Sequence, residues 1–317
     1  MIMDILEDKS IIELVGLLKT KIRKKTISSK ENSNLSAPRF IFICGKEIVD
    51  GEETIRSFTI DFLKKHKEMN KFGTKIQSTL SIISESLYLQ DLAEDIFSFE
   101  KMLAELSDKI IIVAESPGTF CELGAFVMDE RCRKKTIVIN EDKDSYQNSF
   151  ITKGPIKKLE TEDENSIILH NGLERIKNSH EYKYKIEKIA QESLTIRINN
   201  DYKEIELKSL IYELANIIEL FQPLEYFEVE TLYKTIKDFP TYTIKNRIGH
   251  KIKNIRQVVL LMEKLKILNK EDGYYTINNN ISCYNVLFKI TRKEFNDFRI
   301  KYLNRIEKCQ RQRMEIL

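Results

Sequence analysis

The feature that most constrains this 317-residue sequence is an apolar run that leads directly into a turn and then into a helix. Lys109–Ala114 is short, β-branched and flanked by polar residues, which is typical of a buried strand in a parallel sheet. In the next residues, proline presets φ, glycine permits a tight approach, and Thr119 can accept a free helix amide. The strand therefore places Glu115 at its carboxyl end, and we expect Glu122 in the first turn of the helix.

Two carboxylates at the mouth of an open α/β sheet indicate a ligand site, because such sheets bind ligands outside the carboxyl ends of their strands. Amides at a helix start are suited to hold an anion beside them. A purely structural interpretation fits the same residues. A glutamate near a helix start is favoured by the macrodipole alone, and a Pro-Gly turn is common after a strand. The residues by themselves leave both interpretations open.

The flanking segments predict the sheet to which this strand belongs. Residues 39–44 and 134–140 have the composition of further buried strands, and Gly45 fits a tight turn after the first of them. Shorter strands are predicted at 76–80 and 166–169, and helices at 52–69, 89–97, 99–106 and 172–193. This alternation predicts an α/β fold with a doubly wound, Rossmann-like parallel sheet.

The C-terminal part follows a different pattern. Three amphipathic helices are predicted at 207–221, 227–239 and 255–265, followed by a hairpin at 267–277 with an Asp-Gly turn. This order is that of a mostly α winged helix-turn-helix. Basic residues precede or open the third helix, where phosphate contacts would be made: Lys245, Arg247, Lys251, Lys253 and Arg256. Nucleic-acid contact and pure protein docking both remain open for this module.

Charge is distributed unevenly along the chain. The formal net charge is +3, but residues 241–317 hold 17 Lys plus Arg against 7 Asp plus Glu, and the preceding part holds 35 against 42. A basic C-terminal part suggests an anionic polymer as partner. A final helix over 292–313 carries an apolar stripe, which we assign either to the core or to self-association into a homo-oligomer.

Composition argues against several other classes. No apolar stretch approaches the roughly 20 residues that span a bilayer, and the first residues are acidic where a signal peptide is basic. The five cysteines form no C-x-x-C pair, and the four histidines lack ligand spacing, so neither a disulfide framework nor a metal site is predicted. We expect a cytoplasmic protein without a cofactor and without a membrane partner.

The string E-S-P-G-T-F-C-E-L-G-A-F at 115–126 resembles the active-site segment of the nucleoside 2-deoxyribosyltransferase-like superfamily, in which the Glu of E-L-G is the nucleophile. More closely, residues 40–159 resemble the N-glycosidase-like effector proteins of bacterial retrons. Besides the string itself, three pieces carry this resemblance in order: Ile41–Gly45, Phe99–Glu105 and Ser149–Pro155. The C-terminal part is also similar, so the resemblance extends over most of residues 40–280.

The resemblance implies that Glu122 is the nucleophile and that Glu115 is the acid/base or the ribose-positioning partner. Glu100 is a weaker catalytic candidate. Glu115 stands where an Asp is more usual, and its spacing from Glu122 departs slightly from the pattern of the superfamily. Further residues are expected to bind substrate at the ends of the two strands: Cys44, Gly45, Ser116, Pro117, Gly118 and Thr119.

These assignments predict an N-glycosidase that hydrolyses NAD or a nucleotide. The retron resemblance implies a toxic effector of anti-phage defence, restrained by the reverse transcriptase and its multicopy single-stranded DNA. The predicted parts are an N-terminal helix and linker over 1–38, a catalytic domain over 39–194 and a winged-helix domain over 195–317. The alternative is a non-catalytic, nucleotide-sensing regulator that binds DNA.

Overall fold

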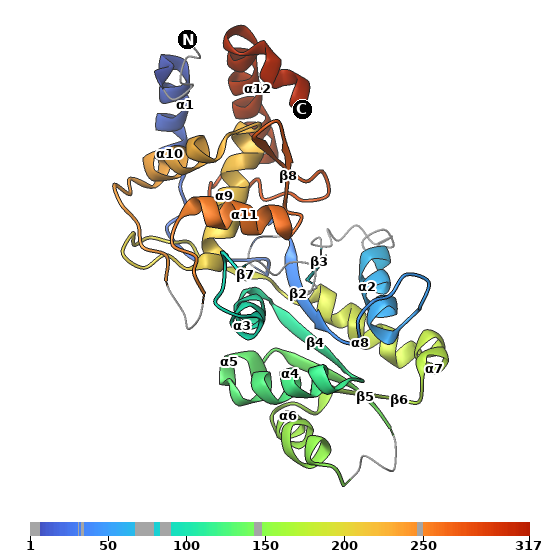
Figure 1. Cartoon of the computed structure of the whole chain (residues 1–317). Coiled ribbons are helices and arrows are strands. Elements are labelled where there is room, and N and C mark those ends of the chain that lie inside the picture. The colour runs from blue at the N-terminus through green and yellow to red at the C-terminus, as the bar shows by residue number, and fades with distance from the viewer. Residues whose placement is uncertain are drawn as a thin grey trace. The chain divides into compact units, whose positions relative to one another are not determined.

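The computed structural model of the chain describes residues 7–30, 32, 35–66, 79–82, 90–142, 148–245 and 250–317 (Figure 1). Contacts divide the chain into two compact units. One, here called the sheet unit, comprises Arg39–Tyr88 and Asp95–Glu192. The other, here called the helical unit, comprises Met1–Pro38, Leu89–Glu94 and Ser193–Leu317.

A five-stranded parallel sheet forms the centre of the sheet unit. Its central strands are built from almost continuous apolar runs and are buried along nearly their whole length, as strands covered on both faces must be. In chain order the strands are β2 (Arg39–Cys44), β3 (Thr79–Ile82), β4 (Lys109–Ala114), β5 (Thr136–Glu141) and β6 (Ile167–His170), and the spatial order is β3-β2-β4-β5-β6.

Helices cover both faces of this sheet (Figure 1). Alternate strand residues such as Ile41 and Ile111 pack in one core cluster with Leu63 and Ile186 from the helices of the first face. On the second face the rings of Phe42 and Phe126 meet edge to face. The first face holds α2 (Ile55–His66), α7 (Leu173–Asn178) and α8 (His180–Gln191), and the second holds α3 (Ile96–Leu106), α4 (Pro117–Met128) and α5 (Glu130–Arg133).

The predicted α/β class and parallel sheet are confirmed, with two corrections to the helices. The helix predicted over 89–97 is wrong in its described part, because residues 90–94 form turns and a bridge and α3 begins only at Ile96, capped by Asp95. The single helix predicted over 172–193 is broken at Ser179, whose hydroxyl accepts the Tyr182 amide and starts a new helix. Of the predicted strand 76–80, residues 76–78 lie outside the described residues.

The helical unit contains three helices and a hairpin in the predicted order. They are α9 (Leu207–Phe221), α10 (Tyr226–Lys237), α11 (Ile255–Lys264), β8 (Leu268–Glu271) and β9 (Tyr274–Ile277). Asp272 and Gly273 both have positive φ, 47° and 86°, as a tight hairpin turn requires. α1 (Lys9–Lys19) and α12 (Arg292–Cys309) belong to the same unit, and the short helical segment η5 (Arg311–Ile316) follows α12.

The apolar stripe of α12 belongs to the core of the helical unit. Phe295, Tyr302 and Ile306 are buried, and the Tyr302 ring packs edge to face on Phe221 of α9. Of the two assignments of this stripe, the structure supports packing in the core. The homo-oligomer remains a prediction, and the stripe does not support it.

Residues 26–38, predicted as a linker, are partly built into the helical unit. β1 (Ile27–Ser28) pairs antiparallel with β7 (Thr195–Ile196), and Leu35 and Ala37 are buried. The linker prediction was based on polar composition. Composition cannot reveal a two-residue strand such as β1, which forms only by pairing with the distant β7. The same unit takes in residues 90–94, where the amide of Lys251 donates to Leu92 O at 2.8 Å.

Candidate active site

The strand order places the ends of β2 and β4 at a special point of the sheet. Counted within the sheet the order is 2-1-3-4-5, which reverses between these two strands. Ligands of open α/β sheets bind outside the carboxyl ends of the strands at such a reversal. β2 ends at Cys44, which pairs with Ile112, and β4 ends one residue before Glu115. The predicted residues from both strands therefore converge on the edge where a ligand is expected.

Helix α4 begins earlier than the sequence suggested. Ser116 is its N-cap and Pro117 its first residue, because proline is preorganised for that position. Thr119 is the third helical residue and completes a capping box with Ser116. Glu122 consequently lies in the second turn of α4, and the prediction that it lies in the first turn was wrong.

The same capping leaves few amides at the helix start for an anion. The amides of Glu115 and Ser116 donate to Thr119 Oγ1, at 3.2 and 3.0 Å, and the Thr119 amide donates to Ser116 Oγ at 3.3 Å. Pro117 has no N–H group. Gly118 therefore supplies the one amide of the turn that has no partner among the described residues. The turn offers a ligand a single backbone donor and not a cluster of them.

Glu122 is the most perturbed group of the site. Burial and the neighbouring carboxylate of Glu100 raise its pKa to about 8, and the Cys44 thiol, which is hydrogen-bonded to it, and the positive charge of Arg56 act in the opposite direction. Its Oε2 atom is buried, and no hydrogen-bond partner for it occurs in the described part of the chain. This carboxyl oxygen is therefore left without a donor near the sheet edge where a ligand is expected.

Three of the predicted residues thus come together. Glu122 on α4, Glu100 on α3 and Cys44 at the end of β2 interact through their side chains. Burial, with the two carboxylates nearby, raises the pKa of Cys44 well above its usual range, so this thiol is neutral at physiological pH. Glu100 and Glu122 are both half-buried, and two such carboxyl groups side by side favour a state in which they share one proton.

Glu115 is held separately at the same edge. Its Oε1 accepts the Lys46 amide at 3.0 Å, and burial raises its pKa. No hydrogen bond joins Glu115 to Glu122 among the residues that the structure describes. Glu115 follows β4 and is held by the Lys46 amide, whereas Glu122 lies on α4, so the two carboxylates are positioned independently.

The sequence-based site missed Arg56, which is buried at the amino end of α2. Gly45 touches it: a Cβ atom on Gly45 would lie 2.9 Å from both Cβ and Cδ of Arg56. Gly45 was predicted to allow the close approach of a nucleotide. In the structure its lack of a side chain also leaves room for Arg56. In the sequence Arg56 stands between Ile55 and Ser57 near the start of the helix predicted over 52–69, and nothing in that pattern marks it as buried.

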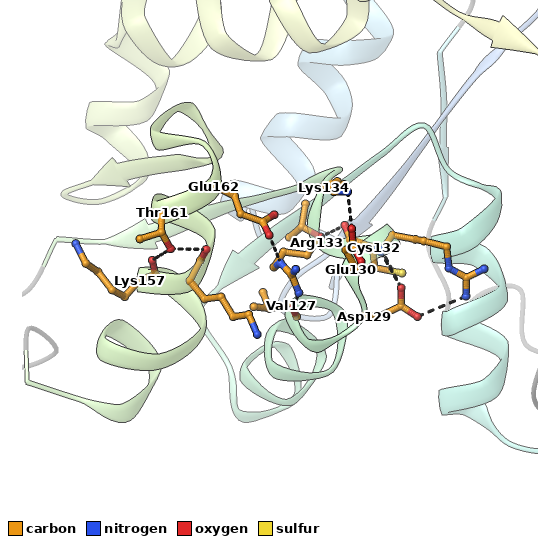
Figure 2. A network of polar contacts seen from close by, with 12 residues as sticks. Val127, Asp129, Glu130, Cys132, Arg133, Lys134, Lys157, Thr161 and Glu162 are labelled. Atoms are coloured by element: carbon orange, nitrogen blue, oxygen red, sulfur yellow. Dashed lines mark hydrogen bonds and ion pairs between the residues drawn. The ribbon is translucent and has the colours of Figure 1, made fainter.

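Polar contacts at the far end of α4 fix the helix that carries Glu122 (Figure 2). Arg133 donates to Val127 O at 2.9 Å and to Glu162 Oε1 at 2.7 Å, which links the end of α4 to α6 (Lys157–Glu162). Asp129 caps the amides that start α5. The retron-like piece Ser149–Pro155 leads into α6 through the π-helical segment η3 (Thr152–Ile156), which contacts α4.

The predicted nucleic-acid-binding residues lie in the helical unit, and several have partners there. Lys245 Nζ is 2.6 Å from Glu204 Oε1, and Lys251 Nζ is 3.3 Å from Gln90 O. The Arg256 guanidinium lies over the Tyr226 ring, and the side chain of Lys253 is exposed. The remaining one, Arg247, lies outside the described residues.

The described residues contain no cluster of three or more His, Cys, Asp or Glu side chains arranged for a metal ion. Nor does any helix among them combine the length and apolarity needed to cross a membrane.

Comparison with known proteins identifies the family. A family model described as STM3845 retron effector protein matches residues 52–270. This chain belongs to that family. The match spans the sheet unit from α2 onward and the three-helix part of the helical unit, so it covers both the carboxylate site and the basic residues.

Two proteins of Escherichia coli are similar to this retron effector. The "Retron Ec73 putative ribosyltransferase/DNA-binding protein" is 34% identical over 149 residues, which cover 44% of this chain and 46% of that protein. The "Retron Ec86 putative ribosyltransferase/DNA-binding protein" is 27% identical over 281 residues, which cover 83% of this chain and 84% of that protein. The chain thus spans less than half of the Ec73 protein and most of the Ec86 protein, and the expected retron family is confirmed.

Proposed function

We propose that this retron effector is an N-glycosidase in which Glu122 is the nucleophile. The observation that carries the proposal is the buried, unpartnered Oε2 of Glu122 beside Glu100, at the reversal point of a parallel sheet. The names of the two relatives, putative ribosyltransferases, support it because ribosyl transfer acts on the same bond between ribose and base. We assign this chemistry to the predicted catalytic domain, residues 39–194.

In the proposed reaction, the ionised carboxylate of Glu122 attacks the anomeric carbon of the ribose as the bond to the base breaks. Because the pKa of Glu122 is raised to about 8, the ionised form that attacks becomes more populated as the pH rises towards 8. Glu115, whose pKa is raised by burial, donates a proton to a departing purine or pyrimidine, whereas nicotinamide leaves NAD as a neutral base without one, and Glu115 then acts in its ionised form as the base for water. A water molecule then gives its proton to Glu115 and its hydroxyl to the anomeric carbon, and Glu122 is released. The net result is hydrolysis with retention of configuration.

We further propose that the substrate carries a phosphate group, with NAD first and nucleotides second. The Gly118 amide at the start of α4 is the backbone donor that supports this preference. Cys44 and Gly45 would line the same edge from β2.

Purified full-length protein should release free base from NAD or from nucleotides faster than from the corresponding nucleosides. The measurement is chromatography of products after incubation with NAD, ribonucleotides, deoxynucleotides and unphosphorylated nucleosides, each run beside the Glu122→Gln protein. Release from nucleosides alone would contradict the phosphate preference. Equal release from both proteins would reject Glu122 as the nucleophile. Release from neither protein would contradict the N-glycosidase and favour the non-catalytic nucleotide sensor.

For the helical unit we propose that residues 195–317 form a winged helix that docks on retron nucleoprotein. In this proposal the enzyme is a toxin of anti-phage defence. The reverse transcriptase and its multicopy single-stranded DNA restrain it through the docked winged helix. The order of three helices and a hairpin, the basic charge of residues 241–317 and the DNA-binding label of the relatives support this assignment. The exposed Lys253 is the strongest candidate for a phosphate contact.

Changing Lys251, Lys253 and Arg256 together to Glu should weaken binding to single-stranded DNA and flatten its salt dependence by about one unit of slope per lost phosphate contact. The control is a triple change of the same charge at the exposed Lys266, Lys293 and Lys301. Binding is measured by fluorescence anisotropy at several salt concentrations. Unchanged binding in the first variant, or equal weakening in both, would reject these residues as the docking element.

A further inference from the structure

The helical unit holds an open groove beside the short sheet of β1 and β7. The two strands pair antiparallel, so the residues that precede β1 lie next to the residues that follow β7. Lys24 comes shortly before β1, and Asn200, from the stretch after β7, donates from its side-chain amide to Lys24 O at 2.8 Å. The groove has a volume of about 690 Å³ and is lined by residues 24–26, by most of the stretch 197–206 and by Lys245.

The acidic side chains of the groove already have partners within the chain. Glu206 Oε1 lies 2.5 Å from Arg197 Nη1. Glu204 Oε1 lies 2.6 Å from Lys245 Nζ. Asp201 caps the turn that follows it, because its Oδ1 accepts the amide two residues along the chain at 2.8 Å. Each carboxylate is therefore compensated, and none is left to attract a cation.

Lys24 and Lys25 are in a different state. Both are exposed and line the groove, and neither has an ion pair in the part of the chain that the structure describes. Their backbone is anchored, since the Arg23 amide donates to Leu287 O at 2.9 Å and Lys24 O accepts from Asn200. Two adjacent positive charges thus stand on a fixed segment, and an anionic ligand is what they attract.

An aromatic ring accompanies these charges. Tyr202 lies in the turn between Asp201 and Glu204, two residues that line the groove, and it is 37% exposed. Lys203 Nζ lies 6.0 Å from the centre of the ring, and the ring packs on Phe239 with 6.0 Å between centroids. Proteins that bind single-stranded nucleic acid combine a basic groove for the phosphates with aromatic side chains on which bases stack.

The groove also adjoins residues proposed for docking. Lys245, one of the basic residues predicted to contact nucleic acid, lines it. The Lys245 amide donates to Ile205 O at 2.8 Å, which attaches the segment before α11 to the stretch after β7. An acidic protein segment would engage the lysines but would not need a ring for stacking. The combination therefore favours a nucleic acid with unpaired bases.

We propose that this groove binds single-stranded DNA, with Lys24 and Lys25 on its phosphates and Tyr202 stacked against an unpaired base. The inference rests on the proposed docking of the helical unit on retron nucleoprotein. It adds a contact surface built from the residues before β1 and after β7, outside helix α11 and outside the hairpin of the proposed winged helix.

Changing Lys24 and Lys25 together to Gln should weaken binding to single-stranded DNA and lower the slope of log affinity against log salt. Each phosphate contact on a single strand contributes about 0.7 to this slope, so two lost contacts should lower it by about 1.4. The matched control changes Lys293 and Lys301 to Gln, because both are exposed in the same unit. The control should keep the wild-type slope.

Tyr202→Leu should weaken binding to single-stranded DNA by at least about fivefold, the lower end of the effect of one lost stacking contact, and leave the salt slope unchanged. Tyr202→Phe keeps the ring and should bind as the wild type does. Binding to a duplex of the same sequence should not respond to Tyr202→Leu. The control is Tyr184→Leu, since Tyr184 is an exposed tyrosine of the sheet unit.

The experiment uses full-length protein and a fluorescein-labelled single strand of mixed sequence, with anisotropy measured at several salt concentrations. Thermal melting checks that each variant is folded. Unchanged binding in the Lys24 and Lys25 variant or in folded Tyr202→Leu would overturn the proposal, as would equal weakening in the matched controls or with the duplex. If Tyr202→Leu does not fold, Tyr202→Phe decides: wild-type affinity with the lowered slope of the lysine variant supports the proposal, and reduced affinity rejects it.

The variant with Lys251, Lys253 and Arg256 changed to Glu separates this proposal from the proposed docking function. Weakening in that variant alone would reject the groove and leave the proposed docking intact. Weakening in the groove variants alone would support the groove and reject the residues at α11. A wild-type protein that binds no single-stranded DNA would reject both.

Discussion

Glu122→Gln should lower the rate of base release by about three to six orders of magnitude, as expected when an enzyme loses its nucleophile. Gln keeps the size of the side chain and removes the carboxylate that attacks the anomeric carbon. The assay is base release by the purified protein under single-turnover conditions. Glu130→Gln serves as the control, because Glu130 is an exposed glutamate at the start of α5. Activity within tenfold of wild type would exclude Glu122 as the nucleophile.

The same substitution should leave the fold intact and stabilise it at alkaline pH. The pKa of Glu122 is raised from 4.5 to about 8 in the folded protein, so the unfolded chain loses its proton first. The favourable contribution of this group is therefore complete below pH 4.5 and is lost as the pH rises to about 8. We expect equal melting temperatures for the two proteins at acid pH and a higher one for Glu122→Gln above pH 8.

Lys237→Met should destabilise the helical unit by about 3–5 kcal/mol, the usual cost of removing one partner of a buried ion pair. Lys237 and Glu213 are 3% and 0% exposed, with Nζ 3.4 Å from Oε1. Without the lysine, the donors that remain to the carboxylate among the described residues are the Tyr233 hydroxyl at 2.8 Å and the Asn199 amide at 2.7 Å. Urea unfolding followed by circular dichroism measures the loss.

Two comparisons make this prediction specific. Lys234→Met, on the same helix but in a half-exposed pair with Glu230, should cost less than about 1 kcal/mol. Adding Glu213→Gln to Lys237→Met should recover part of the stability, because it removes the unpaired charge. Burial raises the pKa of Glu213, so the destabilisation should also shrink as the solution is made more acidic. Equal costs for Lys234 and Lys237 would contradict the buried-pair argument.

The sequence predicted the sheet well because its strands are buried on both faces. Arg39–Cys44 and Lys109–Ala114 are apolar runs whose limits are set by polar neighbours, and both strands have the predicted bounds. Helix α9 and the hairpin turn at Asp272 were also predicted correctly, because an amphipathic repeat and an Asp-Gly pair favour their structures without help from distant residues.

The parts that could not be predicted depend on distant partners. Arg56 is buried only because Gly45 and the end of β2 lie beside it. β1 exists only because β7, far along the chain, completes it. The interaction of Glu100 with Glu122 likewise needed the α3–β4–α4 arrangement. The periodicity of the sequence cannot predict these long-range contacts. The resemblance to retron effectors nevertheless identified Glu100 and Glu122 as candidates.

The helical unit is assembled from three separate stretches of chain, which has a consequence during protein synthesis. Ribosomes add about 5–20 residues per second, so the first stretch waits roughly 10–30 s before residues 193–317 emerge to cover it. Meanwhile the sheet unit has all its strands. The proposed toxic part can therefore fold on the ribosome before the part proposed to restrain it is complete. A single truncation near residue 193 also cannot separate the two units. Residues 1–38 and 90–94 of the helical unit would remain attached to the sheet unit without the residues on which they pack.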